Sequence, residues 1–273
     1  MRLNFFCDID GTLLPFGKEV PRSAVDAIER ARGDGHRFFL STGRSPAEVD
    51  PRLKVIEFDG GVYSNGAIVT YHGDTILDKR MSDEDIDYLL GYAEKNGFLV
   101  MIQTDDGTYM SEETKEFFYS SMEAVSGHPI EVPNLITNDS LSFPRSEVRK
   151  FLFLSPFHKL DVSRKELSDR YQVIDNAVGI PQTDMVEVCM KGLNKGTGVI
   201  TLIQSIGEDI ESTVGIGDGS NDKEMISAAG LGIAMGNATD DVKKMADWVT
   251  TDVNDDGLKN AIVHAMMVLG AKQ

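Results

Sequence analysis

The sequence predicts an α/β protein with a doubly wound, Rossmann-like parallel sheet as its core and a small α+β domain inserted into that core. Short apolar runs alternate with amphipathic stretches at both ends of the chain, which is the pattern of strand-helix-strand units. This alternation breaks off near residue 82 and resumes near residue 190. The length of 273 residues suffices for one large domain or two ordinary ones, so both parts can bury a core.

The first segment, up to residue 81, is expected to begin the parallel sheet. Leu3–Cys7 is a short apolar run typical of a buried strand. Ser23–Asp34 has apolar residues at helical spacing and runs into Gly33 and Gly35, which are helix-stop signals. His36–Leu40 is then a second strand. The further elements expected here are a third unit through Pro46–Leu53, strands within Gly61–Tyr71 around the turn Asn65-Gly66, and a return strand at Thr75–Leu77.

The middle segment, 82–189, is expected to form the inserted α+β domain. Ser82 and Asp85 resemble a capping box in which Asp replaces the usual Glu, and the helix that they begin ends at Gly97. The order of the following elements suits a small α+β domain better than a continued parallel sheet. Strands are expected at Phe98–Thr104, Tyr109–Met110, Phe151–Leu154 and Met185–Met190, and helices at Glu112–Ser126 and Lys159–Arg170.

After Lys191 the alternation of strands and helices returns, so both chain ends are expected to build one core. The predicted domains are therefore 1–81 with 190–273 for the core and 82–189 for the insertion. Strands are expected at Thr213–Ile216 and Leu231–Met235, and helices at Lys195–Ile206, Asn221–Ala229, Thr239–Met245 and Gly257–Leu269.

The composition excludes several classes of protein. The 44 Asp and Glu against 27 Lys and Arg give a net charge of −17, which argues against a protein that wraps nucleic acid. No apolar run approaches the ~20 residues that span a bilayer, and acidic residues follow the first apolar run too soon for a signal peptide. We therefore expect a cytoplasmic protein without membrane contact. Cys7 and Cys189 form no CxxC motif and are expected to be core residues, and the five histidines have no metal-ligand spacing.

An acidic pair follows the first predicted strand, in the segment Asp8-Ile9-Asp10-Gly11-Thr12. Ligands of open α/β sheets bind at the carboxyl ends of the strands. Residues i and i+2 of an extended chain project to the same side, so Asp8 and Asp10 can face one crevice. Because adjacent carboxylates repel each other, this arrangement favours a divalent cation, and an oxygen-rich open site suits Mg²⁺. An Asp-Gly turn that merely ends a strand is the alternative.

A second acidic cluster, Gly217-Asp218-Gly219-Ser220-Asn221-Asp222, also lies between an apolar strand and a helix. It does not fit the dinucleotide fingerprint GxGxxG, because Ser220 occupies the place of the third glycine. Taken alone, Asn221 and Asp222 could simply cap a helix. Two such clusters at strand ends of one predicted sheet nevertheless favour a common site.

Two further segments are candidates for binding an anion. Thr42 and Gly43 end the second strand with a hydroxyl and a backbone amide, although an ordinary strand-to-helix turn has the same composition. Lys195 opens a helix, where the dipole also favours anions, although a lone lysine is more often solvated. The segment 252–257 matches the first half of a calcium loop, but Val263 stands where a bidentate Glu is required, so an EF-hand is rejected.

The segments DIDGTLL, STGR, NKG and GDGSND, in this order, resemble the haloacid dehalogenase (HAD) superfamily of phosphohydrolases. The resemblance covers essentially the whole chain and is closest to the Cof-type sugar-phosphate phosphatases with a class IIB cap. The segment Ser64-Asn65-Gly66-Ala67 is typical of that branch. Asp10 and Thr42 lie too close in sequence for a cap between them, whereas a long interval separates Thr42 from Lys195. This spacing argues against the phosphoglucomutase-like and small-cap branches.

The resemblance implies a role for each motif residue. Asp8 would be the nucleophile that forms an aspartyl-phosphate, and Asp10 the general acid and base. Mg²⁺ would be held by Asp8, the carbonyl of Asp10 and Asp218, with Asp222 as an outer ligand or positioning residue. The residues that would bind the phosphoryl group are Thr42, Gly43, Asn221 and Lys195, the last also neutralising the nucleophile.

We therefore expect a Mg²⁺-dependent phosphatase acting on a small phosphorylated metabolite, with a sugar phosphate as the first choice. The inserted domain would cover the crevice, exclude water and contact the rest of the substrate. A phosphotransferase or mutase with the same intermediate is the nearest alternative. A phospho-acceptor signalling module is a second one, and Asp10 argues against it because a general base would shorten the life of an aspartyl-phosphate.

Overall fold

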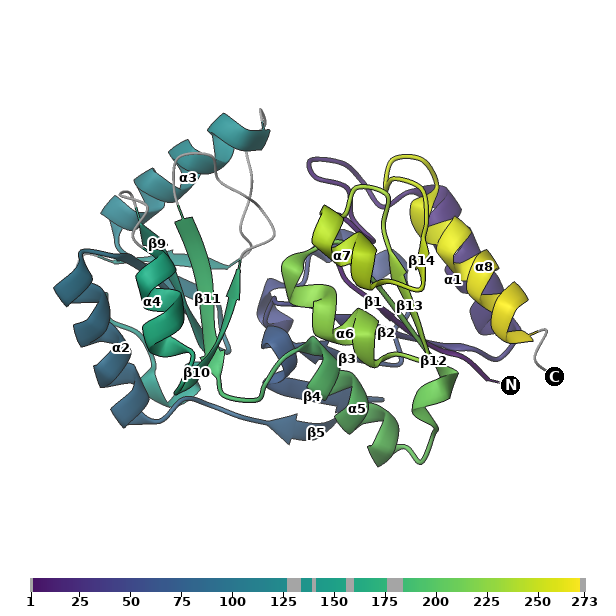
Figure 1. The fold of residues 1–273 in the computed structure, drawn as a ribbon, viewed down its shortest axis with the longest axis horizontal. Helices are drawn as coiled ribbons and strands as arrows, with labels where there is room; N and C mark the ends of the chain where they lie inside the picture. Colours follow the sequence, from purple (N-terminus) through teal and green to yellow (C-terminus); the bar gives the residue numbers. More distant parts are fainter. Residues whose placement is uncertain (1, 127–133, 139–140, 156–159, 176–183, 271–273) are drawn as a thin grey trace. The chain divides into compact units, whose positions relative to one another are not determined.

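The computed structural model describes residues 2–126, 134–138, 141–155, 160–175 and 184–270 (Figure 1). The chain forms two compact units. The core unit consists of Met1–Gly43, Asp50–Asp78 and Asn194–Gln273, and the inserted unit consists of Arg44–Val49 and Lys79–Leu193. No helix in the described ranges is both long and apolar enough to cross a bilayer.

The core unit is built on an eight-stranded sheet, and the predicted α/β class with a parallel core is confirmed. The strand order is β14-β13-β12-β1-β2-β3-β4-β5. Neighbouring strands from β14 to β3 are parallel, whereas β4 and β5 extend the sheet as antiparallel hairpins. The strands are β1 Asn4–Cys7, β2 Arg37–Ser41, β3 Gly60–Tyr63, β4 Ile68–Tyr71, β5 Asp74–Asp78, β12 Thr213–Gly217, β13 Leu231–Ala234 and β14 Trp248–Val249.

Helices cover both faces of this sheet, because side chains alternate between the faces along each strand. Phe5 stacks on Phe38 on one face, and Phe6 stacks on Phe39 on the other. Helices α1 (Arg22–Gly33) and α8 (Gly257–Gly270) lie side by side along one face, and Figure 1 shows α5, α6 and α7 on the other. These three helices are α5 Lys195–Ser205, α6 Lys223–Ala228 and α7 Asp240–Met245.

The register of the three central strands brings the candidate segments to one edge. Cys7 of β1 pairs with Leu40 of β2 and with Ile216 of β12, so these three residues lie at the same level of the sheet. Asp8, Thr42 and Asp218 follow these positions by one or two residues. Because the strands are parallel, all three residues leave the sheet at its carboxyl edge, where open α/β sheets bind their ligands.

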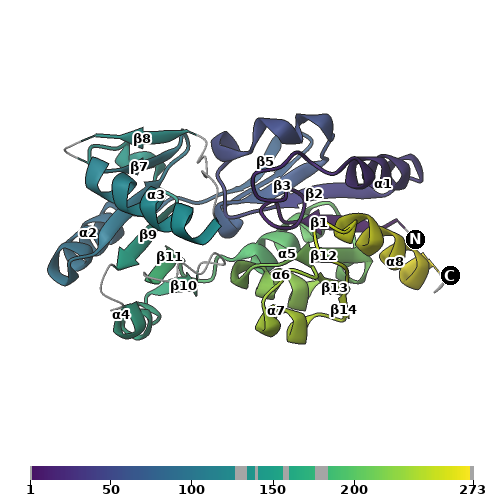
Figure 2. The same cartoon turned by 90° about the horizontal axis from the view of Figure 1, so that it is seen from above.

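The inserted unit has its own six-stranded sheet, which is mostly antiparallel (Figure 2), with the order β10-β11-β9-β6-β7-β8. Its strands are β6 Leu99–Gln103, β7 Thr108–Met110, β8 Leu135–Thr137, β9 Lys150–Ser155, β10 Tyr171–Asp175 and β11 Asp184–Met190. Apolar side chains of α2 (Asp83–Asn96) and α4 (Leu160–Leu167) pack on one face of the sheet. Phe118 of α3 (Glu112–Ser126) packs on the opposite face.

The segment expected to form a third strand-helix unit is different in the structure. Pro46–Glu48 and Pro51–Val55 are two short 3-10 turns instead. The carboxylate of Glu48 is buried, and it accepts hydrogen bonds from the Ser45 amide at 2.9 Å, from Gln103 Nε2 at 2.7 Å and from the Thr108 hydroxyl. These bonds from β6 and β7 explain why Arg44–Val49 belongs to the inserted unit.

Three strands were not expected from the sequence, and all three are short or lie at a sheet edge. β8 and β14 have three and two residues, and β10 pairs only along β11. Edge strands need only one well-packed neighbour, so their sequences show a weak apolar pattern. The predicted start of one helix, Lys159, lies outside the described residues, and so do His128 and His158. Cys7 and Cys189 are both buried, as expected.

Candidate active site

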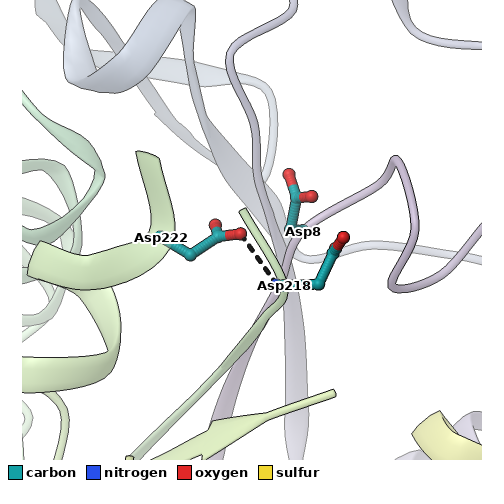
Figure 3. A group of neighbouring side chains, drawn as sticks. All are labelled: Asp8, Asp218 and Asp222. Carbon is teal, nitrogen blue, oxygen red and sulfur yellow. Dashed lines mark hydrogen bonds between the residues drawn. The ribbon is translucent and has the colours of Figure 1, made fainter. Parts of the chain in front are cut away.

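Three carboxylates meet at the carboxyl edge of the core sheet (Figure 3). Asp8 follows β1, Asp218 follows β12, and Asp222 lies at the start of α6. One carboxylate oxygen from each residue lies within 4.8 Å of the others. The sequence places Asp8 more than 200 positions before Asp218 and Asp222, and the pairing of β1 with β12 brings it to them.

Lys195 joins two of these carboxylates. Its Nζ atom donates to Asp8 Oδ1 at 2.7 Å and to Asp222 Oδ1 at 2.6 Å. The lysine is fully buried, so the alternative of a solvated surface residue is excluded. A buried charge is tolerated only when it is paired, and here one cation stands against two anions. The residual negative charge is what a bound cation would neutralise.

Asp222 fixes the loop that carries Asp218. Its Oδ2 atom accepts hydrogen bonds from the backbone amides of Asp218 at 3.0 Å and Gly219 at 2.9 Å. Figure 3 shows the first of these bonds as a dashed line. Since Asp222 is fully buried and its two oxygens hold Lys195 and two amides, it is placed to orient its neighbours.

Asp218 is held from the other side by the first motif. The hydroxyl of Thr12 donates to Asp218 Oδ1 at 2.7 Å. Gly11 has a φ of +81°, and a Cβ at this position would lie 2.4 Å from Asp218 Oδ2. The glycine of the DIDGT segment is therefore required both by its backbone conformation and by the close approach of this carboxylate.

Burial and mutual repulsion change the acidity of these groups. Burial raises the pKa of Asp8 well above its usual value, the charge of Asp222 raises it further, and Lys195 opposes both effects. Burial and Asp222 raise the pKa of Asp218 to about 7. Burial alone would lower the pKa of Lys195, but the carboxylates of Asp222 and Asp8 outweigh that effect and raise it. Lys195 therefore stays protonated, and the acidic groups compete for protons in the absence of another cation.

The remaining predicted residues lie at the same edge of the sheet. Thr42 is buried, and its backbone amide donates to the carbonyl of Val62 at 2.8 Å. Asp10, Gly43 and Asn221 are half-buried in the loops that follow β1, β2 and β12, in that order. The side chains shown to be in contact with one another are those of Asp8, Thr12, Lys195, Asp218 and Asp222.

Sequence reasoning missed two residues of this region. Thr12 belongs to the first motif, which by itself indicates no role for it, although its hydroxyl holds Asp218. Asn237 lies outside the four motifs; its Nδ2 donates to the carbonyl of Gly11 at 2.8 Å, and its Oδ1 accepts from the Val253 amide at 2.9 Å. Asn237 lies just beyond β13, so the rule that ligands bind at carboxyl ends of strands could have singled it out.

The donor set fits a hard divalent cation such as Mg²⁺. All the candidate ligand atoms are oxygens, and the buried carboxylates exceed the one lysine in charge. Among the described residues this is the group of acidic side chains that fits a metal ion. The rejected calcium segment is a polar turn instead, in which Asp252 Oδ1 accepts from the Asn254 amide at 2.8 Å.

A model of the haloacid dehalogenase-like hydrolase family matches residues 5–262. The chain therefore belongs to the haloacid dehalogenase-like hydrolases, and the family resemblance of its motifs is confirmed. Its relatives include phosphatases, and the chain is a phosphatase of this family.

Two relatives illustrate the similarity in sequence. The 5-amino-6-(5-phospho-D-ribitylamino)uracil phosphatase YitU of Bacillus subtilis is 27% identical over 257 residues, which cover 92% of this chain and 93% of YitU. The pyridoxal phosphate phosphatase YbhA of Escherichia coli is 26% identical over 262 residues, which cover 93% of this chain and 95% of YbhA.

Solved structures agree with the fold. The HAD subclass IIB sugar phosphatase BT4131 has a TM-score of 0.77 at 27% identity, and the match covers 99% of both chains. The phosphatase BT1666 of Bacteroides thetaiotaomicron has a TM-score of 0.80 at 26% identity, covering 97% of this chain and 95% of BT1666. Both matches extend over the core and the insertion, so the similarity is not limited to the sheet that carries the carboxylates.

Proposed function

We propose that this chain is a Mg²⁺-dependent phosphatase that hydrolyses a small phosphorylated metabolite through an aspartyl-phosphate on Asp8. The observation that carries the proposal is the buried contact of Lys195 with Asp8 at the end of β1, next to Asp218 and Asp222. A carboxylate held by a fixed cation, within a cluster that suits a metal ion, is the arrangement needed to attack a dianionic phosphoryl group.

In the first step, the carboxylate of Asp8 attacks phosphorus, and the bond from phosphorus to the ester oxygen breaks. Asp10 gives a proton to that leaving oxygen, so the alcohol departs neutral. In the second step, Asp10 takes a proton from water, and the resulting hydroxide displaces Asp8 from phosphorus. Inorganic phosphate is released, and both carboxyl groups return to their starting states.

The phosphoryl oxygens need positive charge and donors, because uncatalysed monoester hydrolysis is among the slowest reactions known. Lys195 offers a fixed positive charge, and we assign donors to the hydroxyl of Thr42, the amide of Gly43 and the side chain of Asn221. Mg²⁺ would be held by Asp8, the carbonyl of Asp10 and Asp218. Asp222 would be an outer ligand or a positioning residue. When bound, Mg²⁺ would neutralise charge on the phosphoryl group and the nucleophile.

The substrate is proposed to be a small phosphate monoester, with a sugar phosphate as the first choice. The names of three similar proteins give their substrates as a sugar phosphate, a phosphoribitylamino-uracil and pyridoxal phosphate. Each of these substrates is a phosphate monoester, and they differ in the part of the molecule that carries the phosphate. We also propose that 1–81 with 190–273 forms the catalytic domain and that 82–189 selects the substrate. A cytoplasmic location stays a prediction.

Removal of the metal is expected to stop turnover. The purified protein should release inorganic phosphate from some members of a panel of phosphorylated metabolites, or from a generic aryl phosphate, when Mg²⁺ is present. Excess EDTA should abolish this release, and Mg²⁺ added beyond the chelator should restore it. Full turnover in chelator would contradict the metal assignment. Transfer of the phosphoryl group to a second metabolite without phosphate release would favour the phosphotransferase alternative.

Binding of Mg²⁺ is expected to strengthen as the pH rises. The pKa of Asp218 in the folded protein, about 7, lies above the ordinary value of 3.8, so the metal must displace a proton below neutral pH. The same shift makes the metal-free fold lose stability as the pH rises through this range, because the folded state binds the extra proton. Calorimetric titration should show about a tenfold rise in Mg²⁺ affinity per pH unit below neutrality, with proton release. An affinity independent of pH between about 5.5 and 7 would contradict this prediction.

A further inference from the structure

The turn between β3 and β4 has an unusual backbone conformation. Three consecutive residues, Ser64, Asn65 and Gly66, have positive φ values of 49°, 51° and 92°. Glycine adopts such values freely and asparagine tolerates them, but serine rarely does. Strained segments persist only where their surroundings hold them in place, and they are frequent at functional sites. Ser64 and Asn65 are also almost completely buried, so the strain is not that of an exposed loop.

One contact of this turn reaches the candidate phosphate-binding residue. The backbone amide of Asn65 donates to the carbonyl of Thr42 at 3.1 Å. The amide of Thr42 in turn donates to the carbonyl of Val62 at 2.8 Å. Both backbone groups of Thr42 are therefore fixed by β3 and the turn that follows it. A change of the turn would move Thr42 directly.

A second contact reaches the start of the lysine-bearing helix. A Cβ on Gly66 would lie 2.4 Å from the carbonyl oxygen of Asn194, the residue before Lys195. That carbonyl accepts the first hydrogen bond of α5, from the amide of Gly198 at 3.1 Å. A Cβ on Gly198 would itself lie 2.3 Å from Val62 Cγ1 and 3.2 Å from the Cα atom of Gly66. The turn and the first turn of α5 thus touch backbone to backbone, with no room for a side chain.

We propose that the turn Ser64–Gly66 is a positioning element that holds Thr42 and the first turn of α5 in a fixed relation to each other. It acts through its left-handed backbone rather than through its side chains. The catalytic consequence rests on the proposed function, in which Thr42 and Lys195 bind the same phosphoryl group. Displacement by a fraction of an ångström would separate these two groups and slow the chemical step more than it weakens substrate binding.

Two matched glycine variants test the proposal. Gly66 and Gly73 have nearly equal φ values of +92° and +89°, but a Cβ on Gly73 would meet nothing within 4 Å. Both Gly66→Ala and Gly73→Ala add the same backbone strain, and only the first adds the collision with Asn194. We expect Gly66→Ala to lower kcat at least about tenfold with a smaller change in KM, and Gly73→Ala to keep kcat within about twofold. Equal kcat values for the two variants would overturn the proposal.

Hydrogen exchange separates this proposal from the proposed function. The amide of Gly198 should exchange faster in Gly66→Ala than in Gly73→Ala, because its acceptor is the displaced Asn194 carbonyl. This measurement needs no turnover. If the wild-type chain hydrolysed no phosphate monoester, the proposed function would be wrong. The exchange rate of the Gly198 amide would still show whether the turn positions the start of α5. Unchanged exchange of Gly198 in Gly66→Ala would overturn that role, whatever the activity.

A second pair of variants covers the case in which Gly66→Ala does not fold. Asn65→Gly keeps the left-handed backbone and its amide donor, whereas Asn65→Ala strains the same backbone. We expect Asn65→Gly to retain a kcat within about threefold of the wild type and Asn65→Ala to fall further below it. If Asn65→Gly were as impaired as Asn65→Ala, the side chain rather than the backbone would matter, and the proposal would be wrong.

Discussion

Asp8→Asn is expected to reduce phosphate release by about 10⁴-fold or more, since removal of a catalytic nucleophile has effects of this size. The amide is nearly the same shape as the carboxylate but cannot form the covalent acyl-phosphate. The variant should still fold, because an asparagine oxygen can accept the hydrogen bond that Lys195 Nζ now donates at 2.7 Å. Steady-state phosphate release, with a thermal melt of the same sample, measures both expectations.

A matched control for this variant is Asp241→Asn. Asp241 is an exposed carboxylate in α7 that pairs with a lysine, Lys223, as Asp8 does, but it lies outside the carboxylate cluster. The turnover of Asp241→Asn should stay close to that of the wild type.

Rapid quenching with labelled substrate should give a phosphoprotein in the wild type and none in Asp8→Asn. If Asp8→Asn kept near wild-type turnover, the nucleophile assignment would be wrong.

Lys195→Met is expected to destabilise the metal-free fold by about 3 kcal/mol and also to remove most of the activity. Removal of one partner from a buried ion pair leaves the other charge without compensation, and here two carboxylates lose their shared cation. The loss of stability should shrink as the pH falls, because Asp8, whose pKa burial already raises, can take up a proton. Urea unfolding in chelator at several pH values measures this effect.

The double variant Lys195→Met with Asp222→Asn is the control for charge. It removes one of the two uncompensated carboxylates, while the amide oxygen can still accept the backbone amides of Asp218 and Gly219. We expect it to recover part of the stability lost by Lys195→Met without recovering turnover. If the single variant were as stable as the wild type, the lysine would not be needed to balance the buried charge.

Much of the fold follows from local patterns. The apolar runs and glycine stops of the core placed β1, α1 and β2 within one or two residues of their observed ends. The capping signal of Ser82 is also present, since its hydroxyl accepts from the Asp85 amide at 3.1 Å. Such patterns are local, because they depend on side-chain period, caps and turns within a few residues.

The elements that local patterns predict wrongly or miss have a common physical cause. Segment 46–53 has helix-compatible residues, but Glu48 finds its hydrogen-bond donors in Gln103 and Thr108, more than fifty residues further along the chain. Strands β8, β10 and β14 are short or paired on one edge, so their own sequences carry little of the energy that holds them. Neither feature can be deduced from a window of neighbouring residues.

Of the candidate site, too, one part could be predicted from the sequence and the other part could not. The sequence by itself determined the family, the order of the four motifs and the acidic residues that belong to them, because each motif consists of a few neighbouring residues at the end of a strand or the start of a helix. Only the tertiary structure decided that Lys195 lies buried between Asp8 and Asp222, that Thr12 and Asn237 support the first motif, and that Gly66 touches Asn194. These contacts join residues from distant parts of the chain, and the pairing of parallel strands sets their geometry.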